Sequence, residues 1–272
     1  MKYYYSFGKV NFCLDIENFD EGSLSNFRHD FLEECVEYKF SIVDELDEIV
    51  GDFVYRDASI YVTDKCKYFG SVSNSYKNAY MRVYFEDDKY DVQILKSSLN
   101  GPIGAHIVYR VLDCERLLSK KGVVLLHGAC IEVNDSSIVF TAPSGVGKST
   151  QADLWMKYRH ATLINGDRIA IDVFEKNVMG VPFAGSSKIS LNTSCPLSCI
   201  VYLKQSKTNS IRRMSGIEAF KCLWQGMGVQ RYDQKSMNII TLLASEIIKN
   251  IPIYELSCDI SINAVKCLEG VL

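Results

Sequence analysis

The 272-residue sequence has few of the features that mark membrane, secreted or nucleic-acid-binding proteins. No apolar run approaches the roughly 18 residues that a membrane-spanning helix needs. The opening residues, MKYYYSFGKV, contain no apolar segment of the kind found in a secretory signal. The formal net charge is -3 and no basic block stands out, which disfavours a nucleic-acid partner. We therefore expect a soluble, cytoplasmic protein that binds neither membranes nor nucleic acids.

The ten cysteines show no spacing that is typical of a metal site. There is no CxxC pair, and Cys195 and Cys199 in CPLSC lie four residues apart, which is a poor metal signature. We expect small buried thiols in a reducing compartment.

The first part of the chain is rich in tyrosine and phenylalanine, and its alternating pattern predicts short strands. Examples are residues 37–43, 58–63, 79–86 and 90–95. Turn-like sequences lie at 70–75 and 85–91. We predict a small β-rich N-terminal domain, residues 1–100, built on an antiparallel sheet.

The second part, residues 101–272, mixes helical and strand-like periodicities. The predicted helices cover residues 107–118, 148–158, 216–225, 234–249 and 262–268. The predicted strands cover residues 123–133, 136–142, 169–174, 177–182, 199–204 and 252–256. This mixture predicts an α/β core.

One segment of this core reads as a phosphate-binding loop. Residues 142–149, APSGVGKS, follow the pattern G-x-x-x-x-G-K-[ST] except that Ala142 replaces the first glycine. Glycines let backbone N–H groups turn toward phosphates, and the following helix presents its positive end to them. The residues predicted to bind nucleotide here are Ser144, Gly145, Val146, Gly147, Lys148, Ser149 and Thr150. A glycine-rich turn that merely begins a helix is the alternative.

Further candidates lie outside the loop. Asp167 in INGDR is expected at a strand end, where it would hold Mg²⁺ together with the Ser149 hydroxyl; an ordinary turn aspartate is the alternative. Arg212 and Arg213 match the geometry of phosphate oxygens, but a solvated turn also explains them. Lys188 in GSSKIS is a weaker candidate for neutralising phosphate.

Three segments in this order resemble the HPr kinase/phosphorylase family, which is in turn similar to the phosphoenolpyruvate carboxykinases. They are LLHGA, APSGVGKST and INGDRIAID. MGVPFAGSSKISLN and NSIRRMS resemble related kinase-like proteins outside the HPr pathway. The resemblance starts near Val123 and reaches the mid-200s. It implies a P-loop core of the HPr kinase C-terminal type, similar to the carboxykinases, beside a smaller β-rich N-terminal domain.

The resemblance also implies roles for single residues. His127 falls on the family histidine that lies close to the catalytic carboxylate; taken alone, it would be read as a core histidine. The family's paired aspartates fall on Gly166 and Asp167, so only the second is present. One aspartate of that pair accepts the proton of the substrate serine in the family. The predicted catalytic residues are therefore Asp167, Lys148 and His127.

These observations lead to an ATP- and Mg²⁺-dependent kinase as the main hypothesis. Its acceptor would be a hydroxyl, with serine of a peptide, protein or small molecule favoured. An alternative is a non-catalytic nucleotide-binding module whose β-rich domain binds a partner peptide. Carboxykinase chemistry on an oxaloacetate-like acid is a third, although the sequence offers no matching His and Lys metal set.

Overall fold

The computed structural model describes residues 1–57, 59–70 and 78–272, and the chain divides into two compact units. Unit 1 consists of Met1–Ser6 and Val10–Asp113, and unit 2 of Phe7–Lys9 and Cys114–Leu272. The boundary lies at Asp113 rather than at residue 100. The reason is that the buried Asp113 carboxylate accepts hydrogen bonds from Lys67 (2.5 Å) and the Tyr90 hydroxyl (3.1 Å), which ties this segment to unit 1.

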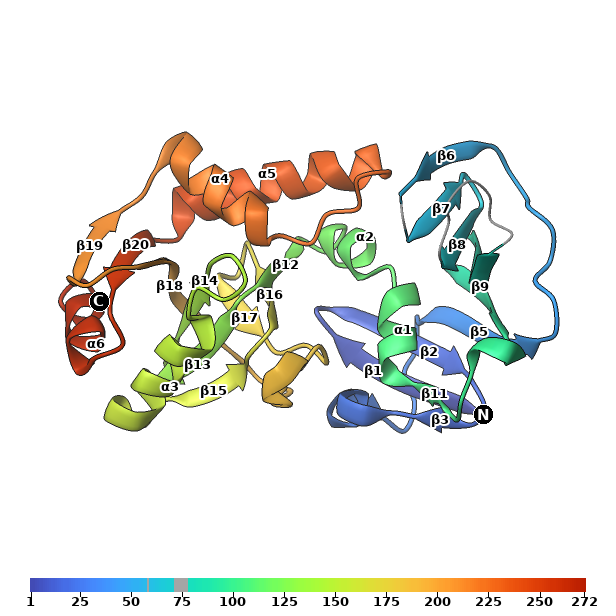
Figure 1. Ribbon diagram of the computed structural model, residues 1–272, viewed down its shortest axis with the longest axis horizontal. Helices are drawn as coiled ribbons and strands as arrows, with labels where there is room; N and C mark the ends of the chain where they lie inside the picture. Colours follow the sequence, from blue (N-terminus) through green and yellow to red (C-terminus); the bar gives the residue numbers. More distant parts are fainter. Residues whose placement is uncertain (58, 71–77) are drawn as a thin grey trace. The chain divides into compact units, whose positions relative to one another are not determined.

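Unit 1 is mostly β-structure (Figure 1). Its main sheet has the order β4-β1-β2-β5-β10-β9-β8-β7-β6. These strands are β1 (Lys2–Phe7), β2 (Val10–Asp15), β4 (Arg28–His29), β5 (Val36–Val43), β6 (Phe53–Arg56), β7 (Ile60–Thr63), β8 (Cys66–Gly70), β9 (Ala79–Glu86) and β10 (Lys89–Leu95). The short strands β3 (Phe19–Asp20) and β11 (Ile103–Gly104) pair with each other. Helix α1 (Ala105–Val111) and the 3-10 turns Gly22–Phe27 and Lys96–Ser98 also belong to the unit.

The sheet of unit 1 is not purely antiparallel as predicted. Strand β5 runs parallel to both β2 and β10. Long connections precede and follow β5, and only such connections allow parallel neighbours. The residue pattern within a strand is the same for both pairings, so it does not reveal the direction. Of the predicted strand 58–63, residues 60–63 form β7, and Ala58 lies outside the described residues, as does most of the predicted turn at 70–75.

Unit 2 is the α/β unit. Its strands are β12 (Val123–His127), β13 (Ala129–Val133), β14 (Ser136–Thr141), β15 (Thr162–Asn165), β16 (Arg168–Asp172), β17 (Asn177–Met179), β18 (Ser194–Gln205), β19 (Ser210–Arg213) and β20 (Ile253–Cys258). Its helices are α2 (Cys114–Ser119), α3 (Lys148–Arg159), α4 (Gly216–Gly226), α5 (Gln234–Asn250) and α6 (Ile262–Glu269), with a 3-10 turn at Gly185–Ser187. The strands follow the order β12-β16-β17-β18-β14-β13-β15, and β20 with β19 branches from β18.

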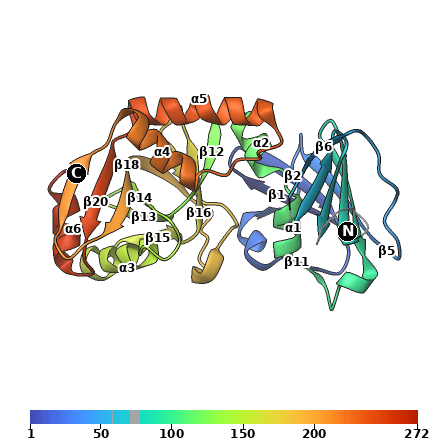
Figure 2. The same cartoon turned by 45° about the horizontal axis from the view of Figure 1, so that its top comes forward.

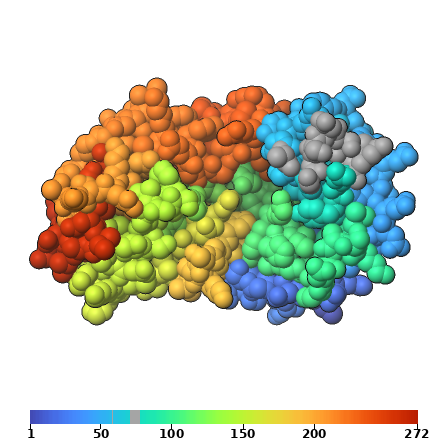
Figure 3. All heavy atoms as spheres, viewed as in Figure 1, coloured from blue at the N-terminus to red at the C-terminus, as the bar shows by residue number. Residues whose placement is uncertain are grey.

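Helices cover both faces of this sheet (Figure 2). Helices α4 and α5 pack on one face, and together they form a continuous orange surface in the space-filling view (Figure 3). Helices α3 and α6 pack on the other face. Strand β14 shows the alternation that this requires, because Val139 belongs to the first core and Ile138 and Phe140 to the second.

Two predicted elements of the second half are each divided. The predicted helix 107–118 is α1 and α2, with Asp113 between them. The predicted strand 123–133 is β12 and β13, which separate at Gly128 and join different partners: β12 pairs with β16, and β13 with β14 and β15. A Cβ at Gly128 would lie 2.7 Å from the Phe140 carbonyl oxygen, so the change of partner requires glycine here.

All ten cysteines are free thiols. Within the described part of the chain, no helix is both long and apolar enough to cross a lipid bilayer.

Candidate functional site

The predicted phosphate-binding loop lies between the end of β14 at Thr141 and the start of α3 at Lys148. Gly145 has a φ of +79° and Gly147 a φ of +120°, conformations that residues with a Cβ rarely adopt. A Cβ added at either glycine would project into open space, so the backbone there faces outward. The loop therefore has the exposed, glycine-dependent backbone that a phosphate cradle needs.

The alanine at the start of the loop is compatible with this conformation. Ala142 is buried and its methyl group packs into the core beside α3. It is not among the residues with positive φ, so the glycine of the usual pattern is not required here. Its carbonyl oxygen accepts a hydrogen bond of 3.0 Å from Lys148 Nζ.

Lys148 is held by the loop itself. Its Nζ donates to the carbonyl oxygens of Ala142 (3.0 Å) and Pro143 (3.4 Å), and the side chain is buried. Burial lowers the pKa of Lys148, and the nearby negative charge of Asp167 acts in the opposite direction. The ammonium group is thus positioned at the loop before any phosphate contacts it.

The start of α3 offers unpaired backbone donors. Gly147, the N-cap residue before Lys148, has no side chain to accept from them, so the first-turn N–H groups are available to an anion. Ser149 and Thr150 are exposed in this first turn. Gln205, at the end of β18, supports the loop because its Nε2 donates to the carbonyl oxygens of Gly145 (3.4 Å) and Val146 (3.3 Å).

Asp167 and His127 come together through the pairing of β12 with β16. His127 pairs with Arg168 in that register, so the ends of the two strands meet. His127 Nδ1 lies 3.4 Å from Asp167 Oδ1, and both side chains are about one-third exposed (38% and 33%). The Gly128 N–H donates to the Asp167 carbonyl oxygen at 2.9 Å, and this hydrogen bond holds the backbone of the turn that carries Asp167.

The charge of Asp167 follows from its neighbours. The hydrogen bond from the His127 side chain lowers the pKa of Asp167, and the positive charges of Arg168 and Lys148 add to this effect, while partial burial opposes it. The carboxyl group is therefore ionised at neutral pH. The charges of Lys148 and Asp167 each shift the pKa of the other group.

Asn165 is a residue of this site that the sequence-based predictions missed. It is fully buried, its Oδ1 accepts from the N–H groups of Asp167 (2.8 Å) and Arg168 (3.1 Å), and its Nδ2 donates to the Val181 carbonyl oxygen (2.8 Å). Asparagine two residues before the turned N–H is a common turn signal, so the letters NGD could have indicated it. Asn165 orients the backbone that carries Asp167.

We expect Asn165→Ala to slow phosphoryl transfer while leaving nucleotide affinity nearly unchanged. The variant leaves two N–H groups and one carbonyl without their partner, which should cost about 1–3 kcal/mol of stability. Thermal unfolding and separate measurements of kcat and nucleotide Kd test this. Asn238→Ala, an exposed change on α5, is the matched control. An unchanged kcat in a correctly folded Asn165→Ala variant would show that the turn does not need this asparagine.

The space beside Gly166, where the resemblance predicts a second aspartate, is occupied by another side chain. A Cβ at Gly166 would lie 2.6 Å from the Ser187 Oγ and 2.7 Å from its Cβ. Ser187 Oγ donates to the Ala184 carbonyl oxygen at 2.7 Å, which holds it in this place. On the neighbouring turn residue, Gly185 has a φ of +55°, and a Cβ there would lie 2.6 Å from the Asp167 Cβ. The turn Gly185–Ser187 therefore fills the space beside Gly166 and Asp167.

Comparisons with known proteins give little beyond this geometry. No family model matches the chain, and no curated protein matches it in sequence. Among solved structures, the chain is similar to the Hpr(Ser) kinase/phosphatase from Coxiella burnetii, with 10% identity over 54% of this chain and 94% of that one, at a TM-score of 0.28. A likeness at this TM-score carries no conclusion about function.

Other candidates lie away from this group. Arg212 stands on β19, which is separated from the loop strand β14 by β20 and β18, a distance of about 14 Å in the sheet. Its guanidinium donates hydrogen bonds to Glu255 (3.0 and 3.1 Å) and forms an ion pair with Glu218, so two carboxylates hold it; a role in phosphate binding stays a prediction. Arg213 is exposed on the same edge strand. Lys188 is exposed and follows the turn that contacts Asp167.

Asp172 lies at the opposite end of β16 from Asp167. It is buried, its Oδ1 accepts from the N–H groups of Phe174 and Glu175 (3.2 Å each), and its other oxygen pairs with Lys9. These contacts give it a structural role within unit 2.

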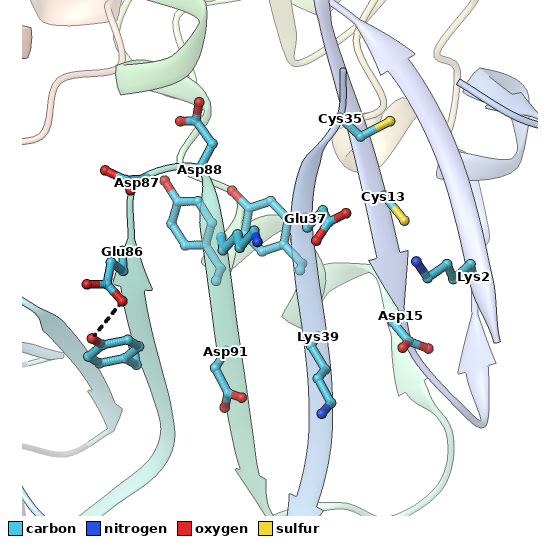
Figure 4. A pocket seen from close by; sticks show the side chains of 14 residues that line it. Lys2, Cys13, Asp15, Cys35, Glu37, Lys39, Glu86, Asp87, Asp88 and Asp91 are labelled. Carbon is cyan, nitrogen blue, oxygen red and sulfur yellow. Dashed lines mark hydrogen bonds between the residues drawn. The ribbon is translucent and has the colours of Figure 1, made fainter. Parts of the chain in front are cut away.

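One cavity lies beside this site, and another lies in unit 1. One of about 370 Å³ is lined by His127, Ser144, Tyr202 and Gln225, among others, so it opens beside both the histidine and the loop. Another, of about 790 Å³, lies on the sheet face of unit 1 (Figure 4). Its acidic and basic side chains stand on neighbouring strands, such as Glu37 and Lys39 on β5, and it contains no phosphate-binding loop.

Proposed function

We propose that the protein is an ATP- and Mg²⁺-dependent phosphotransferase that moves the γ-phosphoryl group of ATP to a hydroxyl, with serine of a peptide, protein or small molecule as acceptor. The observation that carries the proposal is geometric: one cavity is lined by both His127 and the loop residue Ser144, and His127 Nδ1 lies 3.4 Å from Asp167 Oδ1. Phosphoryl transfer depends mainly on positioning and on charge stabilisation, and these residues supply both.

The residues fit a magnesium–nucleotide complex. The open backbone at Gly145 and Gly147, with the first turn of α3, suits the phosphates, and Lys148 would add a positive charge. The Ser149 hydroxyl and the Asp167 carboxylate are the oxygen ligands that Mg²⁺ prefers. Bound Mg²⁺ would neutralise charge on the phosphates.

Asp167 and His127 would act on the acceptor. An ionised Asp167 carboxylate orients the acceptor hydroxyl and takes its proton as transfer proceeds. Its lowered pKa makes it a weak base, which suffices where the transition state is loose and the proton leaves late. His127 holds the carboxylate in place. The cavity beside His127 and Ser144 is where the acceptor would bind.

The experiment that tests this function is transfer of labelled γ-phosphate from Mg²⁺-ATP to serine-containing acceptors, with ATP hydrolysis measured in parallel. A wild-type protein that binds Mg²⁺-ATP but neither hydrolyses it nor transfers phosphate, across a broad set of acceptors, would favour the alternative of a non-catalytic module. In that case the charged cavity of unit 1 is the place to test for peptide binding, with Glu37 and Lys39 as the first substitutions.

Restoring the family's aspartate is expected to harm the protein. Gly166→Asp adds a side chain into the space of Ser187, and such overpacking costs about 1–3 kcal/mol of stability. The added negative charge next to Asp167 should also repel an anionic acceptor. We expect a lower melting temperature and a slower transfer rate.

Ser187→Gly in the same chain separates these two causes. The double variant Gly166→Asp, Ser187→Gly removes the crowding and should regain stability, while the rate stays low if charge is the cause. A single variant that transfers phosphate faster than wild type would contradict the view that glycine suits this site.

A further inference from the structure

A cavity of about 510 Å³ adjoins the phosphate-binding loop in unit 2, where strands β18 and β20 end. The loop residues Gly145 and Gly147 and the first-turn residue Thr150 form one side of it. The segments that follow β18 and β20 form the other side, including Asp259 and Ile260. In open α/β sheets, ligands bind at the carboxyl ends of parallel strands, and β14, β18 and β20 are parallel neighbours.

The distance from the loop fits the outer part of a nucleotide. Strand β20 lies two strand spacings from β14, or about 10 Å. Gln151, one residue beyond Thr150, connects the two sides because its Nε2 donates to the Asp259 carbonyl oxygen (3.1 Å) and to Cys258 Sγ (3.2 Å). A nucleoside extends over this distance from phosphates bound at the start of α3.

One wall of the cavity is apolar and partly uncovered. Leu203 and Cys258 are buried in it, whereas Ile260 is 77% exposed. An isoleucine this exposed at the rim of a cavity that adjoins a phosphate-binding loop offers an apolar contact. A purine ring that packs on Ile260 would remove this side chain from water.

The opposite, polar feature is the Asp259 carboxylate. Both hydrogen bonds from Ser261, from its N–H (3.0 Å) and its hydroxyl (2.8 Å), fall on Oδ1. The Asn209 side chain also forms a hydrogen bond with this carboxylate. The hydrogen bonds from Ser261 lower the pKa of Asp259, so the group is ionised at neutral pH. A carboxylate accepts up to about four hydrogen bonds, so beside those from Ser261 and Asn209 it can still accept one from a single hydroxyl donor.

We propose that this cavity binds the nucleoside of the substrate nucleotide, with Ile260 against the base and the Asp259 carboxylate accepting a ribose hydroxyl. The proposal rests on the proposed function, since it assumes that the loop binds a triphosphate. It adds that affinity comes from the nucleoside as well as from the phosphates, and that the Asp259 contact reads the sugar rather than the base.

The test compares Mg²⁺-ATP with Mg²⁺-tripolyphosphate by isothermal titration calorimetry. Wild type should bind ATP at least about tenfold more tightly than tripolyphosphate, the effect of one hydrogen bond to a charged group. Asp259→Asn, which keeps an oxygen for Ser261, should weaken ATP binding about tenfold without changing the affinity for tripolyphosphate. Ile260→Ser should weaken ATP binding about fivefold, whereas Ile217→Ser, at a 75% exposed site on α4, should have no effect.

Nucleotide analogues identify the group that Asp259 contacts. In wild type, 2′-deoxy-ATP or 3′-deoxy-ATP should bind as weakly as ATP binds to Asp259→Asn, and the variant should no longer distinguish them from ATP. If both deoxy analogues bind like ATP while Asp259→Asn changes the preference between ATP and GTP, the carboxylate reads the base and the ribose assignment is wrong. Equal wild-type affinity for ATP and tripolyphosphate would overturn the nucleoside site alone. Failure of wild type to bind either one would overturn the proposed function itself.

Discussion

Replacing Lys148 by alanine is expected to abolish phosphoryl transfer and to weaken nucleotide binding. Lys148 is the only charged side chain within the loop sequence APSGVGKS, and its ammonium group already lies at the loop carbonyls of Ala142 and Pro143. Removing it takes away the positive charge that would stabilise the phosphates in the transition state. We expect a loss on the order of 10³-fold in kcat/KM, comparable to the loss of a key electrostatic group.

The control for this variant is on the same helix. Lys157→Ala removes an exposed lysine from the last turn of α3 and should leave the rate unchanged. Steady-state transfer assays and nucleotide titrations on both variants are the measurements. Transfer at the wild-type rate by Lys148→Ala would place the active site elsewhere.

The second large effect is expected for Asp167→Asn. Asparagine keeps the shape of the side chain but binds Mg²⁺ weakly and accepts no proton. Transfer should fall by on the order of 10²-fold or more, while nucleotide binding should change far less, because the loop and Lys148 remain. Rapid-quench measurement of transfer, combined with a nucleotide Kd, separates the two quantities.

The pH dependence gives an independent check on Asp167. Because its pKa is lowered, the carboxylate stays ionised at pH values where an ordinary aspartate begins to protonate, and activity that depends on it is lost only as pH falls through this lowered value. Breaking the His127 contact by His127→Ala should raise the pKa of Asp167 and move the acidic limb of the rate profile to higher pH. Asp135→Asn, in the exposed turn between β13 and β14, is the matched control. A transfer rate of Asp167→Asn equal to wild type would remove this carboxylate from the mechanism.

The sequence predicted the elements around the loop more accurately than the contacts that complete the site. The predicted helix 148–158 is α3, Lys148–Arg159, because the loop motif itself specifies where the helix begins. The strand before it, predicted as 136–142, is β14, Ser136–Thr141. The motif residues and the turn of Asp167 are local signals, so a single sequence shows them.

Local sequence signals could not predict contacts between residues that lie far apart in the sequence. Arg212 depends on Glu255, 43 residues later, and on the pairing of β19 with β20, which periodicity does not specify. Ser187 limits the space available for a side chain at Gly166, and no local sequence signal indicates that these two turns lie next to each other. The parallel direction of β5 is a further case, since alternation is identical in both directions.

From the separation of β12 and β13 at Gly128 we also expect a definite order in which the site assembles during folding. Strands β13 and β14 are joined by the two-residue turn Asn134–Asp135, with φ of +51° and +58°, which is typical of a fast local hairpin. Strand β12 must instead find β16 across a long stretch of chain, and such non-local pairings form slowly. The loop strand should therefore be in place before His127 meets Asp167. In the native state the same asymmetry predicts that β12 amides exchange with solvent through a partial opening that leaves β14 protected.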